Sequence, residues 1–221
     1  MSKQELKMRR CPTGIATLMA AGMVVMGMNN AGAIPIVDTG EPADYQSGWC
    51  LHAGQWLAGE FQVSQATLVT GVEGFFGAAA PGGTVKAAIY ADNSVSGEIP
   101  GALLYSTTFQ VASTGLFPAT WAGASGLAWN LASGNYWLAF EVGSGSRFSG
   151  YMPGDAPSPL GNEAFSRGTG WHPYDSLNMG ARIFGDQFSQ DAANVPDGGA
   201  TSLLLGLAVV MTGAFRQRFS R

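Results

Sequence analysis

The sequence contains very little cysteine or histidine, the residue types that build most disulfide frameworks and zinc sites. Its 221 residues include two cysteines, Cys11 and Cys50, and two histidines, His52 and His172. These four residues do not have the spacing of a zinc site. Cys11 lies in an N-terminal stretch that we expect to be removed, so we expect no internal disulfide in the mature chain. We interpret Cys50 as a small buried apolar residue, and a reactive or intermolecular thiol is the alternative.

Lysine and arginine are scarce between the two ends of the chain. Most of the 11 basic residues lie close to a terminus, which leaves Lys86, Arg147, Arg167 and Arg182 between residues 34 and 195. The same stretch holds 13 acidic residues, so its formal charge is −9, against −4 for the whole chain. Contacts to phosphate need lysine and arginine. The composition therefore argues against a nucleic-acid partner and favours solubility and attraction of cations.

Residues 34–187 also lack a long helical pattern with capping signals. They show instead short runs of alternating character, such as 84–92, where Val85, Ala87 and Ile89 share one face. Clusters of turn residues separate these runs, a pattern typical of an all-β sandwich or barrel. We expect an irregular segment over residues 34–48. We expect strands over residues 55–63, 67–76, 84–92, 102–112, 127–131, 135–142, 146–152 and 177–184.

The first 33 residues have the organisation of a secretory signal peptide. The basic residues at positions 3, 7, 9 and 10 are followed by an apolar stretch over residues 15–28. Ala31-Gly32-Ala33 has the A-x-A form of a cleavage site, so we expect the mature chain to begin at Ile34. The pair Arg9-Arg10 would suit a twin-arginine signal, but the residues after it do not continue that pattern.

The C-terminal 27 residues combine a polar motif, an apolar run and a basic end. The motif is Val195-Pro196-Asp197-Gly198-Gly199-Ala200-Thr201, the apolar run spans residues 202–215, and Arg216, Arg218 and Arg221 follow. As a helix, residues 200–215 would be about 24 Å long at roughly 1.5 Å per residue, slightly short of a full bilayer core. The arginines would stay in the cytoplasm by the positive-inside rule. A sorting signal and a permanent anchor both fit this arrangement.

This tail resembles the PEP-CTERM class of bacterial sorting signals, in the variant that opens Val-Pro-Asp-Ser-Gly. Gly198 stands where that variant has serine, and Thr201 stands at its threonine. The resemblance implies recognition by an exosortase, a membrane-embedded cysteine transpeptidase, after export by the secretion machinery. It also implies a transient stay in the inner membrane through the C-terminal helix, then release to the cell surface or extracellular matrix. Residues 188–194 would be the linker before the signal.

The body of the chain resembles the jelly-roll choice-of-anchor domains that carry such tails. The residues behind this resemblance are Gln55 to Phe61, Val85 to Tyr90 with Asp92, Pro100-Gly101, and Gly134 to Phe140. The resemblance implies a jelly-roll-like β-sandwich over residues 34–187. It supplies no active site.

The loop after the run 84–92 could hold a calcium ion. Asp92, Asn93 and Glu98 offer oxygen ligands within seven residues, and Ca²⁺ prefers oxygen. The spacing is not that of an EF-hand loop, and Asp and Asn also initiate turns through local hydrogen bonds. A plain hairpin loop is therefore the alternative, and no other metal or cofactor is indicated.

Two aromatic residues, Trp171 and Tyr174, lie in a segment that we interpret as a turn-rich loop. Aromatic rings flanked by polar groups can stack on a sugar, whose C–H face is apolar and whose rim carries hydroxyls. The alternative is that these rings fill the core or cover its ends. Trp171 and Tyr174 are our candidates for a glycan-binding surface.

Catalysis has little support in the sequence, and we assign no catalytic residue. The region 34–187 has only two histidines and no nucleophile elbow of the form G-x-S-x-G. We therefore expect a secreted structural protein of the cell surface or exopolysaccharide. A carbohydrate-binding module of the extracellular matrix is the alternative, followed by an extracellular hydrolase.

We expect the mature surface protein to have lost residues 1–33 and its C-terminal helix. Mass spectrometry of the intact protein from the cell surface would measure both ends. A form that still ends at Arg221 would contradict cleavage and support a permanent anchor.

Overall fold

The computed structural model describes residues 35–43, 48–78, 83–93 and 98–188. The chain divides into two units, Met1–Gln187 and Phe188–Arg221, and only Phe188 of the second unit is described. The predicted signal peptide, its cleavage residues Ala31 and Ala33, the sorting motif and the basic end all lie outside the described residues. The fold below is that of the first unit.

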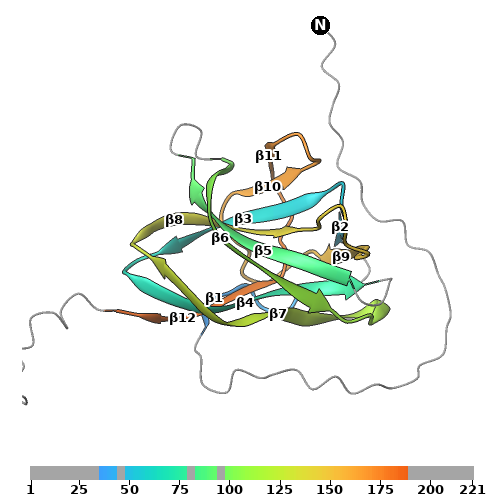
Figure 1. The fold of residues 1–221 in the computed structure, drawn as a ribbon, viewed down its shortest axis with the longest axis horizontal. Coiled ribbons are helices and arrows are strands. Elements are labelled where there is room, and N and C mark those ends of the chain that lie inside the picture. Colours follow the sequence, from blue (N-terminus) through green and yellow to red (C-terminus); the bar gives the residue numbers. More distant parts are fainter. Residues whose placement is uncertain (1–34, 44–47, 79–82, 94–97, 189–221) are drawn as a thin grey trace, which may run out of the picture. The chain divides into compact units, whose positions relative to one another are not determined.

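The described regular structure is all β (Figure 1). No helix in these parts of the chain is long and apolar enough to cross a membrane. The strands are β1 (Pro35–Asp38), β2 (Gly48–Leu51), β3 (Trp56–Val63), β4 (Thr67–Ala78), β5 (Gly83–Asp92), β6 (Pro100–Val111), β7 (Gly115–Leu131), β8 (Gly134–Glu141), β9 (Gly150–Pro153), β10 (Glu163–Ser166), β11 (Trp171–Tyr174) and β12 (Ala181–Gln187).

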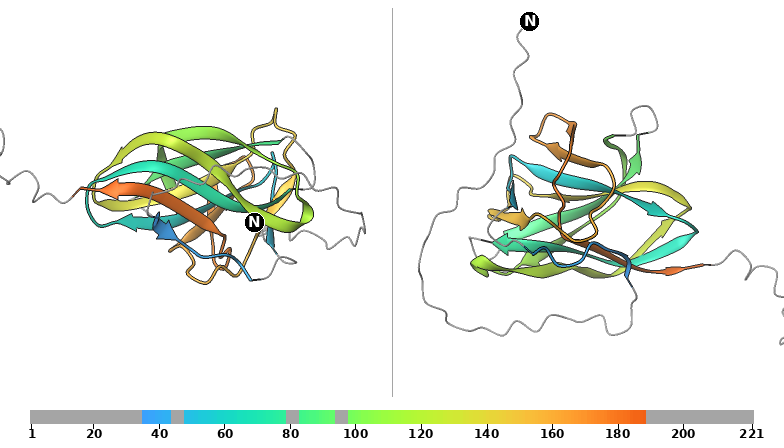
Figure 2. Two further views of the ribbon diagram at one scale, coloured as in Figure 1. Left: turned by 90° about the horizontal axis from the view of Figure 1, so that it is seen from below. Right: turned by 180° about the vertical axis from the view of Figure 1, so that it is seen from behind.

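These strands form two antiparallel sheets of six strands each. The first sheet has the order β1-β12-β4-β9-β2, with β7 paired to β4. The second sheet has the order β11-β10-β3-β8-β5-β6. Figure 2 shows the sheets as two layers, with the β10–β11 hairpin at the top of the right-hand view.

The strands from β3 to β8 pair in a nested pattern. β5 pairs with β6, β4 pairs with β7, and β3 pairs with β8. The chain therefore folds back on itself like one long hairpin whose middle pair lies in the first sheet. β8 also pairs with β5, which joins the outer and inner pairs side by side in the second sheet. This pattern places strands far apart in the sequence next to each other.

One hydrophobic core fills the space between the two sheets. Alternation directs every second residue of β3, β5 and β8 into it, as expected for strands with one face on a core. Phe76 of β4 is completely buried, and its ring centroid lies 5.2 Å from Phe140 and 5.9 Å from Phe109 of the opposite sheet. Among the described residues, the buried members of this core lie between Trp49 and Ile183, within residues 34–194.

Most of the expected strands are confirmed, and the main errors are at the start of the domain, in β7 and in β11. The segment 34–48 is not wholly irregular, because β1 pairs with β12 and β2 begins at Gly48. β7 is far longer than the expected 127–131, since it pairs along the whole of β4. Residues 171–174 form a strand and not a loop. The sequence of β11 contains Pro173, which an edge strand tolerates.

Cys50 is disulfide-bonded in the full chain. It is half-buried in β2, and none of the described residues is a free cysteine. The other cysteine of the chain, Cys11, lies outside the described residues. The expectation of a lone thiol concerns the chain after removal of residues 1–33, so it stays a prediction for the mature protein.

We expect Phe76→Ala to lower the free energy of unfolding by about 3–5 kcal/mol, because it removes a buried ring that joins both sheets. Leu103→Ala is the matched control, since that side chain is half exposed and should change stability by less than about 0.5 kcal/mol. Urea unfolding of both variants measures the difference. Equal effects would contradict the central position of Phe76 in the core.

Candidate functional site

The second sheet carries a second, smaller hydrophobic cluster on the face that points away from the core. Residues of β3, β8 and β10 with small side chains, Ala58, Ala139 and Ala164, lie side by side there through strand pairing. Larger rings pack around these alanines. The rings are those of Trp137, Tyr90 and Trp171, and Trp56 contacts Trp171 beside them.

The second sheet curls toward this face. Three strands separate β5 from β11, so in a flat sheet these strands would lie about 19 Å apart at roughly 4.8 Å per step. Yet the ring centroids of Tyr90 on β5 and Trp171 on β11 are only 5.8 Å apart. The side chains span only part of the gap, so the sheet itself must bend and bring the β10–β11 hairpin over the alanines. We call this surface the concave face.

The centre of the concave face holds a buried carboxylate. Glu141, the last residue of β8, is 2% exposed. Its Oε2 lies 2.7 Å from the ammonium of Lys86, and its Oε1 accepts a hydrogen bond from the Tyr90 hydroxyl. Burial and the neighbouring Glu141 raise the pKa of Tyr90, so the phenol stays protonated and donates. These contacts satisfy a charge that would otherwise be costly to bury.

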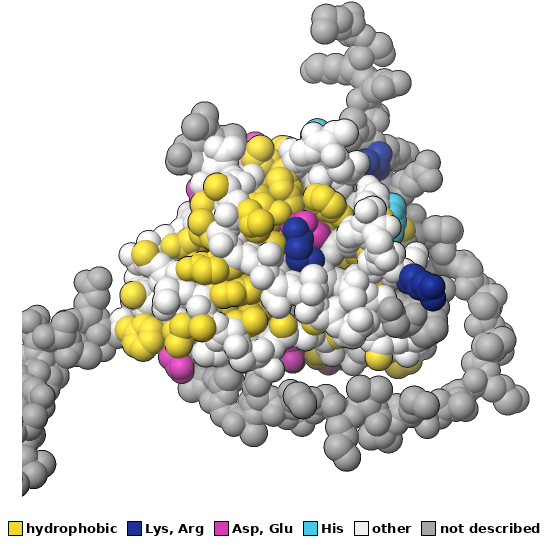
Figure 3. All heavy atoms as spheres, viewed as in Figure 1, with side chains coloured by type: hydrophobic (Ala, Val, Ile, Leu, Met, Phe, Trp, Pro, Cys, Tyr) yellow, Lys and Arg dark blue, Asp and Glu magenta, His cyan; other side chains and the backbone are white. Residues whose placement is uncertain are grey.

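A groove opens beside this carboxylate, with a volume of about 460 Å³. Its lining includes one aromatic ring, the ion pair and several hydroxyl groups, from Trp56, Thr84, Lys86, Thr108, Glu141 and Ser146. The volume lies within the range of roughly 300–1,000 Å³ that is common for small-molecule sites. In Figure 3, hydrophobic side chains gather over this side of the molecule beside a basic group that touches an acidic one.

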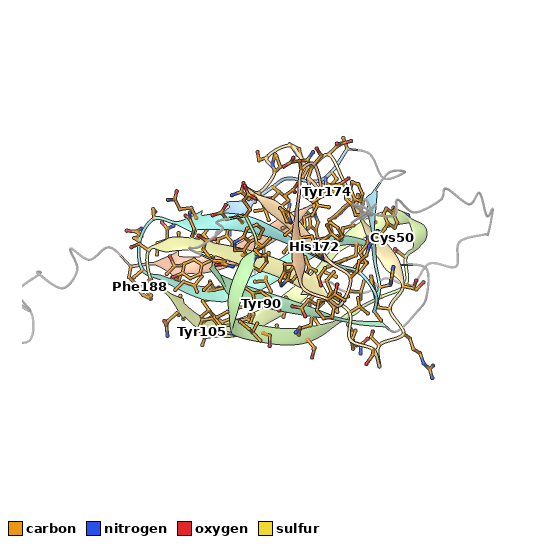
Figure 4. The ribbon with its side chains drawn as sticks, turned by 90° about the horizontal axis from the view of Figure 1, so that it is seen from above. Cys50, Tyr90, Tyr105, His172, Tyr174 and Phe188 are labelled. Carbon is orange, nitrogen blue, oxygen red and sulfur yellow. The ribbon has the colours of Figure 1, made fainter. Side chains whose placement is uncertain are left out.

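The two aromatic residues chosen from the sequence do not form one platform. Trp171 packs on the concave face, whereas Tyr174 faces the main core. The Tyr174 ring lies 4.9 Å from Trp49 and 5.8 Å from Phe165. In Figure 4, Tyr174 and His172 lie toward the same end of the domain as Cys50, and Tyr105 lies toward the other. Of these two residues, Trp171 remains a candidate for stacking on a ligand.

Sequence reasoning missed three residues of the concave face: Trp56, Lys86 and Glu141. Alternation in the runs 55–63, 84–92 and 135–142 does place each of them on the face opposite the core. Their proximity could not be found that way, because the sequence does not give the order of strands in the sheet. The pairing of β8 with both β3 and β5 brings them together.

Of the three calcium candidates, Asp92 has a side-chain hydrogen bond in the structure. The Oδ1 of Asp92 accepts a hydrogen bond of 3.1 Å from Trp137 Nε1, and Glu98 is exposed. Asn93 is half-buried beside residues 94–97, which lie outside the described part of the chain. Among the described residues, no group of three or more acidic, histidine or cysteine side chains could hold a metal ion.

A second pocket of about 270 Å³ is lined by Glu98, Asn162, Glu163, Tyr174 and Asp175, among others. Glu163 is buried, and its oxygens accept hydrogen bonds from the backbone N–H groups of Leu177 and Asn178. Burial raises the pKa of Glu163 to about 7, although these N–H groups favour the charged form. The side chain therefore fixes the segment before β12.

We expect the free energy of unfolding to fall as the pH rises from about 5 to about 8. The folded carboxyl of Glu163 holds its proton up to a pKa of about 7, against an ordinary value of 4.5, so its stabilising contribution is lost as pH rises through that range. Glu163→Gln does not ionise and should flatten the dependence. Urea unfolding across this pH range tests it, with the exposed Glu98→Gln as control. An unchanged slope in Glu163→Gln would contradict this role.

The comparisons with known proteins add no assignment to this geometry. The chain matches no protein-family model, and no curated protein is significantly similar to it.

Proposed function

We propose that this protein is an exported structural component of a bacterial cell surface or exopolysaccharide, sorted by an exosortase. The observation that carries the proposal is the C-terminal order of Val195-Pro196-Asp197, an apolar run and three arginines. Its position after the folded domain supports this proposal, because the buried core residues of the described part of the chain end at Ile183. The signal peptide, the membrane helix and their removal belong to the same proposal.

We further propose that the domain is a jelly-roll-like β-sandwich of the choice-of-anchor type. The support is its strand order. A jelly roll arises when a long antiparallel hairpin wraps into two sheets. The nested pairs of β3 to β8 have this form, and the neighbours β3-β8-β5-β6 in one sheet face the pair β4-β7 in the other.

A non-catalytic role fits the contacts of the groups that would do acid–base chemistry. The Nδ1 of His52 accepts a hydrogen bond from Gly54 N, and the His172 ring lies 5.5 Å from Phe165. Glu141 and Glu163 are both buried and engaged in the contacts described above. The contacts of His52, Glu141 and Glu163 hold turns and packing in place, which supports a structural protein over a hydrolase.

Carbohydrate binding is the second candidate function, and the concave face favours it. Half-buried Trp56 and Trp171 lie beside a groove that also offers an ammonium, a carboxylate and hydroxyls. Aromatic rings suit the apolar C–H face of a sugar, and the polar groups suit its hydroxyls. An exopolysaccharide would be the natural ligand at the proposed location.

We expect residues 34–194 to be retained on an immobilised polysaccharide, and Trp171→Ala to weaken this retention by about tenfold, since stacking of one ring contributes about 1–2 kcal/mol. Tyr174→Ala is the matched control and should leave retention unchanged, because that ring faces the core. Retention should persist without Ca²⁺, because the lining of the groove does not include Asp92, Asn93 or Glu98. Affinity electrophoresis in the presence and absence of EDTA measures both effects.

Retention on no polysaccharide would exclude the carbohydrate-binding function but leave the sorted structural role standing. Loss of retention in EDTA would instead support the calcium site at Asp92, Asn93 and Glu98.

A further inference from the structure

We propose that the groove beside Trp56 binds one sugar ring of an uncharged polysaccharide. The inference depends on the proposed carbohydrate-binding function and names the class of glycan and the residues that hold it. It arises from three features of the groove: a fixed aromatic wall, a row of polar groups, and an ion pair that neutralises the basic side chain of its lining.

The aromatic wall is held in a fixed orientation. The indole Nε1 of Trp56 donates a hydrogen bond of 3.0 Å to the carbonyl of Val142. The ring of Trp171 packs against it at a centroid distance of 6.4 Å, tilted by 53°. Trp56 is therefore restrained at its edge and on one side, while it also lines the groove. A ring positioned before binding loses little entropy when a sugar stacks on it.

The opposite wall is equally rigid. The hydroxyl of Ser146 donates to the carbonyl of Thr84 at 2.7 Å and accepts from the N–H groups of Thr84 and Phe148. These bonds tie the loop after β8 to the start of β5. The groove therefore has fixed walls on both sides, as sites for small ligands usually do.

A row of polar groups crosses the groove between these walls. Strand pairing places Thr108 of β6 beside Lys86 of β5, and Lys86 beside Glu141 of β8. The Lys86 side chain is one-third exposed, and its ammonium has donors to spare beyond the bond to Glu141. A hydroxyl, an ammonium and a carboxylate in sequence offer both donors and acceptors. Neighbouring hydroxyls on a sugar ring require this combination.

The charges favour a neutral glycan. Lys86 is the only basic side chain in the groove, and Glu141 already neutralises it at 2.7 Å. A uronic acid or sulfated sugar would have to compete with this buried carboxylate for the same ammonium. Residues 34–195 also carry a formal charge of −9, which repels a polyanion at long range. An uncharged hexose polymer meets neither penalty.

The test uses residues 34–194 in affinity electrophoresis with neutral dextran, galactomannan and hydroxyethyl cellulose, and with anionic alginate and polygalacturonate. We expect retention on at least one neutral polymer and none on the anionic polymers at low salt. Trp56→Ala should weaken retention at least tenfold, and Trp56→Phe should restore most of it, because a phenyl ring keeps the stacking surface. Trp121→Ala is the matched control, since that ring stacks under Arg182 on the other sheet.

The possible results distinguish a wrong choice of groove from a protein that binds no carbohydrate. Retention on no polymer would overturn both the groove and the carbohydrate-binding function. Retention that survives Trp56→Ala would overturn the groove and leave carbohydrate binding at another surface. Retention on alginate or polygalacturonate alone would overturn the neutral class. If Trp56→Ala lowers the melting temperature more than Trp121→Ala does, two other variants replace it in the test. Trp56→Phe should keep most of the retention, and Thr108→Val should weaken it. The opposite result for both variants would overturn the groove.

Discussion

The double pairing of β8 is the constraint on which the rest of this structure depends. β8 lies between β3 and β5, so it joins the outer and inner pairs of the nested hairpin into one sheet. Its alternate side chains serve two environments: Leu138 and Phe140 enter the main core, and Trp137 and Ala139 enter the smaller cluster. A shift of one residue in register would exchange these sets and place Glu141 in the core.

The concave face follows from the sizes of its side chains. Alanines at neighbouring positions of β3, β8 and β10 leave room above the sheet, and the rings of Trp137, Tyr90 and Trp171 fill that room. The free energy gained by burying these rings offsets the free-energy cost of bending the sheet. The same packing brings Trp56 beside Trp171, so the feature that curls the sheet also orients the wall of the groove.

Local patterns were sufficient for the fold class and most strands, but not for the site. Alternation in 84–92 and 135–142 predicts β5 and β8 because each run has one face on the core. β10 and β11 are too short for an alternation of apolar and polar residues to be recognised. Because residues 171–174 form a strand, Trp171 and Tyr174, three residues apart, point to opposite faces. Interpreted from the sequence as a loop, this segment gave no basis for separating the two rings. The contact between Lys86 and Glu141 depends on strand order, which no local pattern contains.

The distribution of charge connects the domain to its two ends. Basic residues cluster in the predicted signal peptide and after the C-terminal apolar run, where, in the proposed export and sorting, they would orient segments in a membrane. The region between them keeps four, of which Lys86 pairs with Glu141 and Arg182 pairs with Asp38. Processing as proposed would therefore release an acidic protein with little free positive charge. Such a protein repels anionic polymers at long range, so the proposed binding of a glycan would depend on contacts that need no net charge, such as those of the aromatic rings of the concave face.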